Sequence, residues 1–143
     1  MIFSQDRDQL RITYFQAWKK ARANQPLEPL ERDIVQVIAE HPEYHALLED
    51  EEAALDQDFS PEAAEVNPFL HMGLHLAIRE QIATNRPQGI QKAHRRLSRC
   101  RADPHVTEHR MMECLVQMIW DSQHFERMPD EAAYLQCIRK LSK

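Results

Sequence analysis

Apolar residues recur every three or four positions through most of the chain, which is the period of an amphipathic α-helix. Few glycines and β-branched residues, with many Ala, Leu, Glu, Gln and Arg, also favour helices. Together with proline and capping residues at the starts, the spacing predicts helices over residues 5–23, 29–40, 68–84, 90–101, about 104–125 and about 130–141, and it allows a further short helix over residues 43–55. We therefore expect an all-α protein, a single domain over residues 1–143 that forms an irregular bundle of five or six helices.

The stretch Asn67–Ile82 is apolar on nearly every side of a helical wheel. Asn67 is suited to cap the helix, and Pro68 suits the first helical position, where no N–H is needed. A helix that is apolar all round is usually buried all round, so we predict that residues 68–84 form the buried central helix. Gly73 costs this helix about 1 kcal/mol relative to alanine, which indicates either a close approach of another helix there or a glycine that is simply tolerated.

The eight histidines are not evenly scattered along the chain. Three pairs are spaced four residues apart, which places both rings of a pair on one helix face: His41/His45, His71/His75 and His105/His109. Glu113 extends the third pair by another four residues. Burying paired imidazoles costs free energy unless their nitrogens find partners. The pattern therefore raises the question of whether these side chains bind a metal ion.

Two imidazoles one turn apart can chelate one ion, and a facing helix can supply further ligands. The predicted metal ligands are accordingly His71, His75, His105, His109 and Glu113, in a site between the central helix and the 104–125 helix. Imidazole with carboxylate suits zinc, iron, manganese or nickel. An open coordination position would allow a metal-dependent enzyme or a sensor, although no catalytic residue or reaction follows from the pattern.

Two other interpretations of the histidines stay open. In the first, the protein is a non-catalytic interaction module, and the same histidines form a buried structural hydrogen-bond network. The partner would then be another protein or a second copy of the chain. In the second, His41 and His45 also take part in a site. This pair is not in the predicted ligand set, because Pro42 lies between the two residues and indicates a helix start.

The net charge of −5 hides an asymmetry between the two halves of the chain. Met1–Leu70 holds 6 basic and 15 acidic residues, whereas His71–Lys143 holds 12 basic and 8 acidic residues. We interpret this as mutual attraction within one fold. The basic run Lys92–Arg101 has no interleaved aromatic residues and no nucleic-acid reader motif, which disfavours a nucleic-acid partner. A solvated face, or a partner for the acidic run Glu49–Asp58, is the better interpretation.

Cys100, Cys114 and Cys137 are widely spaced, odd in number and without a C-x-x-C motif. They predict three reduced thiols in a reducing compartment. No apolar run approaches the length of a membrane span, and the N-terminus lacks a signal-peptide pattern. The expected location is therefore the cytoplasm, with no membrane partner.

Three blocks of the sequence are long enough to carry a family resemblance. They are N-P-F-L-H-M-G-L-H-L-A-I-R-E-Q at residues 67–81, R-P-Q-G-I at 86–90 and H-V-T-E-H-R-M-M-E-C-L at 105–115. In these blocks the chain resembles a proteobacterial family known as domain of unknown function 1841, and the resemblance covers most of the chain. It implies a small bacterial, cytoplasmic, helical protein, and it brings no activity, substrate or cofactor.

A looser similarity of spacing links the histidine pairs to hemerythrin-like and DinB-like metal-binding bundles. Those folds also use H-x-x-x-H and H-x-x-x-E on antiparallel helices. The further ligands that they need are not identified in this chain, and the E-x-x-H pairs of ferritin-like di-iron sites are absent. The similarity is therefore one of spacing alone and does not establish a shared function.

Overall fold

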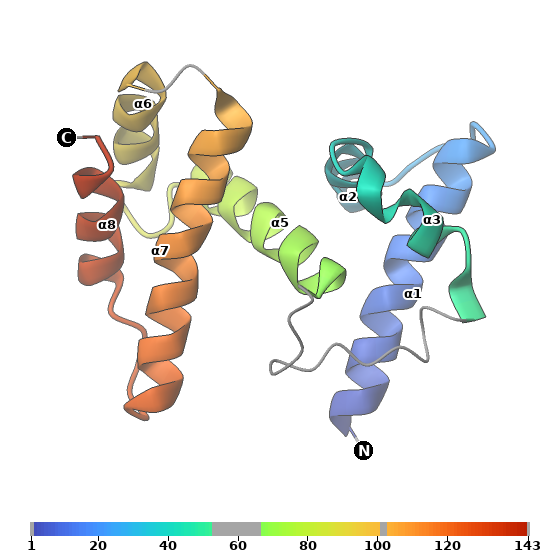
Figure 1. The fold of residues 1–143 in the computed structure, drawn as a ribbon, viewed down its shortest axis with the longest axis horizontal. Helices are drawn as coiled ribbons and strands as arrows, with labels where there is room; N and C mark the ends of the chain where they lie inside the picture. The colour runs from blue at the N-terminus through green and yellow to red at the C-terminus, as the bar shows by residue number, and fades with distance from the viewer. Residues whose placement is uncertain (1, 53–66, 101–102, 143) are drawn as a thin grey trace. The chain divides into compact units, whose positions relative to one another are not determined.

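The computed structural model describes residues 2–52, 67–100 and 103–142, with side chains from residue 9 onward. Within these ranges the chain forms seven α-helices and one 3-10 turn, and it forms no strand (Figure 1). The all-α prediction is confirmed. The chain divides into two compact units, Met1–Leu76 and Ala77–Lys143. That residues 1–143 form a single domain stays a prediction.

The first unit contains four complete helical elements and the first half of a fifth. These are α1 (Ile2–Arg22), α2 (Pro29–Ala39), the 3-10 turn η1 (Pro42–Tyr44), α3 (His45–Leu48) and the start of α5 (Pro68–Thr84). The helix expected over residues 43–55 is interrupted in its described part, because η1 takes its first residues, α3 ends at Leu48 and residues 51–52 are again helical. Residues 53–55 lie outside the described residues. Residues 53–58 of the acidic run lie outside the described residues.

The core of the first unit joins α1 to α2 and to the start of α5. Its members are buried apolar side chains that the helical spacing had placed on inward faces: Tyr14, Phe15, Ile34, Val37, Ile38, Phe69 and Met72. The Phe69 ring centroid lies 5.7 Å from that of Tyr14 and 6.1 Å from that of Phe15. These tilted contacts are favourable aromatic geometries, so α5 is anchored on α1 by its first turn.

Helix α5 begins where the capping residues predict. The Asn67 Oδ1 atom accepts hydrogen bonds from the backbone N–H groups of Phe69 at 3.0 Å and Leu70 at 3.3 Å. The buried side chains of α5 recur every third residue, at Phe69, Met72, His75 and Ile78. The helix is thus buried along one stripe, and the prediction of burial all round is wrong for Leu70, whose side chain is 60% exposed.

Among the described residues, no helix packs tightly against Gly73. The nearest atom to a Cβ built on Gly73 would be the Tyr14 hydroxyl oxygen, at 3.8 Å. That separation is ordinary van der Waals contact, so the first alternative, a close approach of another helix, is wrong for the described residues. An alanine side chain would fit at this position without moving its neighbours.

The second unit contains the end of α5 together with α6 (Ile90–Cys100), α7 (Pro104–His124) and α8 (Glu131–Lys140). Helices α6, α7 and α8 pack against one another, and Figure 1 shows them side by side. Two N-caps start the later helices: the carboxylate of Asp103 accepts from the His105 N–H, and that of Asp130 accepts from the Ala133 N–H. Both caps agree with the predicted helix starts near residues 104 and 130.

Polar contacts complete the second unit. The Arg79 guanidinium binds both carboxylate oxygens of Glu108, at 3.0–3.2 Å, and so ties the end of α5 to α7. The Tyr134 hydroxyl of α8 donates to the Gln81 side chain of α5. The cations of α6 are exposed, as expected of a solvated face: Lys92, Arg95, Arg96 and Arg99. Among the described residues, no helix is both long and apolar enough to cross a membrane.

Candidate metal centre

His41 and His45 both bond to the end of α2. The last carbonyl groups of a helix lack intrahelical partners and can accept from nearby side chains. The His41 Nδ1–H donates to the Val37 carbonyl oxygen at 2.8 Å, and the His45 Nε2–H donates to the Ile38 carbonyl oxygen at 2.9 Å. Since a carbonyl only accepts, the proton of a neutral His41 ring lies on Nδ1 and its lone pair on Nε2.

His71 and His75 face each other along α5. Their Nε2 atoms lie 3.2 Å apart, and their ring centroids are separated by 4.8 Å. The His75 side chain is fully buried. A neutral pair at this distance shares one proton, because one nitrogen must donate while the other accepts. The spacing of four residues therefore brings the two rings together as predicted.

The His41 ring joins this pair within the first unit. Its centroid lies 5.1 Å from that of His71 and 4.7 Å from that of His75. The ring of Tyr44 stacks on His41 at 5.4 Å and lies 6.2 Å from His71. We call His41, His71 and His75 the histidine cluster. Its three imidazoles come from two separate parts of the sequence and are buried or half-buried.

The separations within the histidine cluster suit a metal ion. In a tetrahedral zinc site with Zn–N bonds of about 2.0–2.1 Å, two ligating nitrogens are about 3.3 Å apart, and the ring centroids are about 5 Å apart. The His71–His75 nitrogens and all three centroid distances are close to these values. The bond from His41 to Val37 is also the kind of contact that orients metal-binding histidines in proteins. The His71 and His75 nitrogens are thus spaced as two ligands of one ion would be, with the His41 ring beside them.

The set of metal ligands predicted from the sequence does not include His41. Pro42 does start a helical element, the turn η1, but His41 precedes it at the end of α2. The ring therefore turns toward α5 while His45 turns toward the Trp18 ring, at a centroid distance of 4.7 Å. The spacing of four residues between His41 and His45 is the signal that the sequence offers. It does not show that the two rings face different neighbours.

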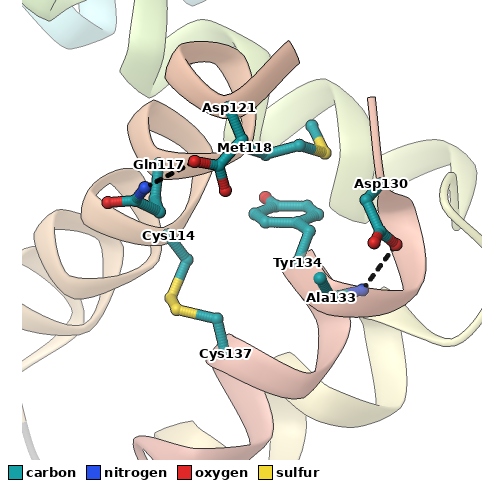
Figure 2. A pocket seen from close by; sticks show the side chains of 8 residues that line it. All are labelled: Cys114, Gln117, Met118, Asp121, Asp130, Ala133, Tyr134 and Cys137. Atoms are coloured by element: carbon teal, nitrogen blue, oxygen red, sulfur yellow. Dashed lines mark hydrogen bonds between the residues drawn. A yellow bond between two sulfur atoms is a disulfide. The ribbon is translucent and has the colours of Figure 1, made fainter. Parts of the chain in front are cut away.

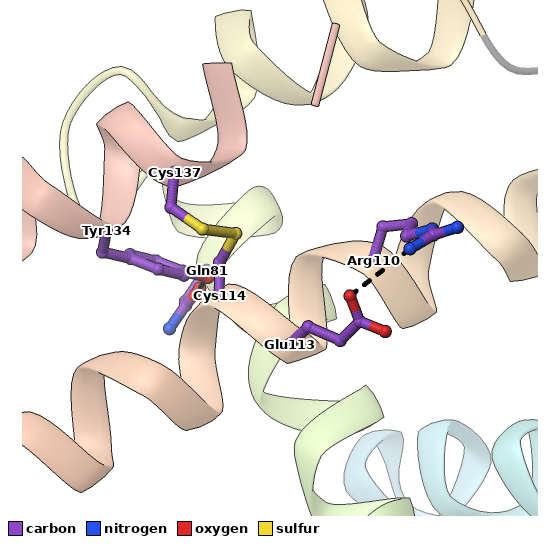
Figure 3. The surroundings of a disulfide bond; sticks show 6 residues. All are labelled: Gln81, Arg110, Glu113, Cys114, Tyr134 and Cys137. Atoms are coloured by element: carbon purple, nitrogen blue, oxygen red, sulfur yellow. Dashed lines mark hydrogen bonds and ion pairs between the residues drawn. A yellow bond between two sulfur atoms is a disulfide. The ribbon is translucent and has the colours of Figure 1, made fainter. Parts of the chain in front are cut away.

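The other predicted ligands belong to the second unit. The rings of His105 and His109 on α7 have centroids 4.1 Å apart, so this pair also shares one helix face. Glu113 has a 68% exposed side chain, and its carboxylate lies 3.6 Å from the Arg110 guanidinium (Figure 3). That both histidine pairs and Glu113 bind the same ion stays a prediction.

The cysteine prediction is wrong for two of the three residues. Cys114 of α7 and Cys137 of α8 form a disulfide with a Cα–Cα distance of 5.9 Å (Figure 3). Figure 2 shows that this disulfide and the Tyr134 ring border the same small pocket. Cys114 is buried in the α7 stripe that faces α8, whereas Cys100 remains an exposed free thiol. The 23-residue separation carries no disulfide signature, so only helix packing reveals the pair.

The helices and the paired imidazoles define the class: an all-α protein with histidines gathered inside its helical units. The chain belongs to the family described as a domain of unknown function (DUF1841), whose model matches residues 6–140. The family resemblance carried by the three sequence blocks is thus confirmed. No curated protein matches the chain, and no solved structure matches it.

Proposed function

We propose that this protein binds a divalent transition metal through the histidine cluster. The observation that carries the proposal is the convergence of three imidazoles, with His71 Nε2 and His75 Nε2 at 3.2 Å. Imidazole donors suit zinc, iron, nickel and copper better than magnesium, calcium or manganese. Zinc is the first ion to test, since its tetrahedral geometry agrees with the separations in the cluster.

Three protein ligands would leave room for a fourth. That position could take water, a substrate or a further side chain, and a metal-bound water is a nucleophile near neutral pH. A metal-dependent enzyme or a metal sensor follows from this arrangement as the functional class. The pair His105/His109 is the sequence-based candidate for the remaining ligand, and a double variant of that pair tests it separately.

Elemental analysis by mass spectrometry tests the proposal. Untagged protein purified without chelator should carry close to one metal ion per chain, and His71→Ala should lose it. His94→Ala is the matched control, because His94 lies on α6 outside both candidate pairs and should keep the metal. A chain that carries no metal, and takes up none on titration with zinc, iron or nickel, would refute the proposal.

A second set of variants separates the two histidine pairs. His105→Ala/His109→Ala should lower the metal content only if α7 contributes ligands. His41→Asn should weaken metal binding while leaving an amide that can still donate to the Val37 carbonyl. His45→Ala is its control on the same segment, because His45 bonds to Ile38 and packs on Trp18 instead.

The second candidate function is a protein-interaction module with a metal-free histidine network. A specific observation favours it: the end of α7 and the segment that follows it expose large apolar side chains, with Trp120 51%, Phe125 57% and Met128 84% exposed. Exposed apolar patches of several hundred Å² often mark interfaces. Sedimentation equilibrium tests this candidate. A concentration-dependent mass that Trp120→Gln abolishes would support it, and a monomer at all concentrations would exclude self-association.

A cytoplasmic location is also a proposal, drawn from the sequence. The Cys114–Cys137 disulfide counts against it, because disulfides persist mainly in oxidising compartments. Alkylation of thiols in intact bacterial cells distinguishes a cytoplasmic location from an oxidising compartment. One alkylated cysteine per chain would indicate an oxidising compartment, and three would indicate the cytoplasm.

A further inference from the structure

Helix α6 packs one face against α7 and α8, and the face away from that contact is positively charged (Figure 1). The packed face buries Ile90, Ala93 and Leu97. With 3.6 residues per turn, four residues of α6 fall within an arc of about 100° on the other side of the helix. All four are exposed cations: Lys92, Arg95, Arg96 and Arg99. We call these four side chains the cationic face.

Among the described residues, no carboxylate neutralises the cationic face. The sequence has no Asp or Glu within residues 81–102, and none of the four cations forms an ion pair with a described residue. On the neighbouring helix α7, Glu108 binds Arg79 instead. A fifth exposed cation, Arg139 of α8, lies at the start of α6, where its guanidinium nitrogen is 3.6 Å from the position that a Cβ on Gly89 would take. Uncompensated charge of one sign attracts a polyanion.

The cationic face suits a nucleic-acid backbone better than a protein or a membrane. Protein interfaces have a core that is depleted of charged residues, and the arc of the cationic face contains no apolar side chain. Amphipathic helices bind membranes through their apolar face, and the apolar face of α6 is buried in the second unit. Phosphate contacts require only accessible cations, and three of the four are arginines, whose planar guanidinium groups match a phosphate.

We propose that α6 binds double-stranded DNA through its phosphate groups, without reading the base sequence. Lys92 and Arg99 are seven residues apart, which is about 10 Å of helix. DNA carries one negative charge per about 1.7 Å of its axis, and its major groove, about 12 Å wide, admits an α-helix. The lack of a reader motif and of aromatic residues in this run disfavours base recognition, whereas phosphate contacts require neither. Such binding does not involve the histidine cluster.

Fluorescence anisotropy with a labelled DNA duplex of about 20 base pairs and mixed sequence tests this on the full-length protein. The duplex should bind at low salt, and a plot of log K against log salt concentration should have a slope of about −3.6, because four cations displace about four counterions. Arg95→Gln/Arg96→Gln/Arg99→Gln should weaken binding at least tenfold and reduce the slope to about −0.9, since only Lys92 remains.

Arg22→Gln/Arg32→Gln/Arg127→Gln is the matched control. It removes the same formal charge from three exposed arginines outside α6. Because salt screens charges that are farther apart than the Debye length of about 10 Å, this variant should keep the affinity within about twofold and the full salt slope. All six substituted side chains are exposed, so circular dichroism should show that both triple variants fold.

Two competitors test the class of partner. Poly-glutamate carries negative charge on a polypeptide, and phosphatidylserine vesicles carry it on a membrane surface. Duplex DNA should bind more tightly than either at an equal concentration of negative charge. Equal or tighter binding of either competitor, no binding of the duplex at low salt, or equal losses in the two triple variants would overturn the proposal.

Discussion

The Nε2 atoms of His71 and His75 lie 3.2 Å apart, a separation that suits both a shared proton and a shared metal ion. The two states compete, because a metal ion requires a lone pair on each nitrogen and displaces the proton between them. The same pair can therefore be a structural hydrogen bond in the apoprotein and a chelate in the loaded protein. Stability measurements with and without metal separate these roles.

Zinc should stabilise the protein by an amount that rises with the logarithm of the free zinc concentration above Kd. At a free zinc concentration of 100 times Kd, the free energy of unfolding should rise by about 2.7 kcal/mol, measured by urea denaturation in chelator-free buffer. His71→Ala should show no rise, whereas His94→Ala should show the full effect. An equal rise in His71→Ala would mean that zinc binds elsewhere.

His75→Gln should leave the metal-free protein within about 1 kcal/mol of the wild type, because an amide can both donate and accept. His75→Leu should cost more, about 1–3 kcal/mol, because it removes the hydrogen-bond partner of His71 in a buried place. Urea denaturation with chelator present measures both. Equal costs for the two substitutions would show that the hydrogen bond contributes little.

Gly73→Ala should stabilise the protein by about 1 kcal/mol. Alanine has the higher helix propensity, and the described residues bring no atom nearer to the added Cβ than the Tyr14 hydroxyl oxygen at 3.8 Å. Thermal denaturation measures the change, and Gly73→Val serves as a bulkier comparison that should lose the gain. A lower melting temperature for Gly73→Ala would show that the helix needs glycine there for another reason.

The Cys114–Cys137 disulfide should contribute about 3 kcal/mol to stability, because it closes a loop of 23-residue separation and so restricts the unfolded chain. Cys114→Ala/Cys137→Ala should lower the urea midpoint by the corresponding amount, and a reducing agent should do the same to the wild type. The exposed Cys100→Ser is the control and should change nothing. An unchanged midpoint after reduction would contradict this expectation.

Two buried tyrosines should make the protein unstable in alkali. Burial raises the pKa of Tyr14 from its usual 10 to about 12, and burial also raises the pKa of Tyr134. Between pH 10 and 12 the unfolded chain loses the Tyr14 proton while the folded chain keeps it, so stability falls as the pH rises. Tyr14→Phe should flatten this part of the profile in urea titrations, whereas Tyr44→Phe should do so less.

Much of the helical layout could be predicted from the sequence, because its signals are local. Asn67-Pro68 and Asp103-Pro104 start helices α5 and α7 where the capping residues indicate, and the apolar stripe of α1 buries Tyr14 and Phe15. The secondary structure of residues 43–55 is harder to predict, since Pro42 allows a tight 3-10 turn that the apolar spacing does not distinguish from an α-helix.

Sequence patterns predict the candidate site only where both contacting residues lie on the same helix. The His71/His75 contact follows from a spacing of four residues, whereas the approach of His41 depends on how the end of α2 packs beside α5. The pairing of Cys114 with Cys137 similarly requires that α7 and α8 pack together. Contacts between separate elements are set by tertiary packing, which single-residue patterns do not encode.

The boundary between the two compact units falls inside α5, between Leu76 and Ala77. A fragment cut there would keep His71 and His75 but only the first half of their helix, and short isolated helices are marginal in water. Any attempt to produce the first unit alone should therefore extend to Thr84, and a split-protein design needs α5 in both pieces. Where such a fragment ends thus decides whether its imidazoles can still come together.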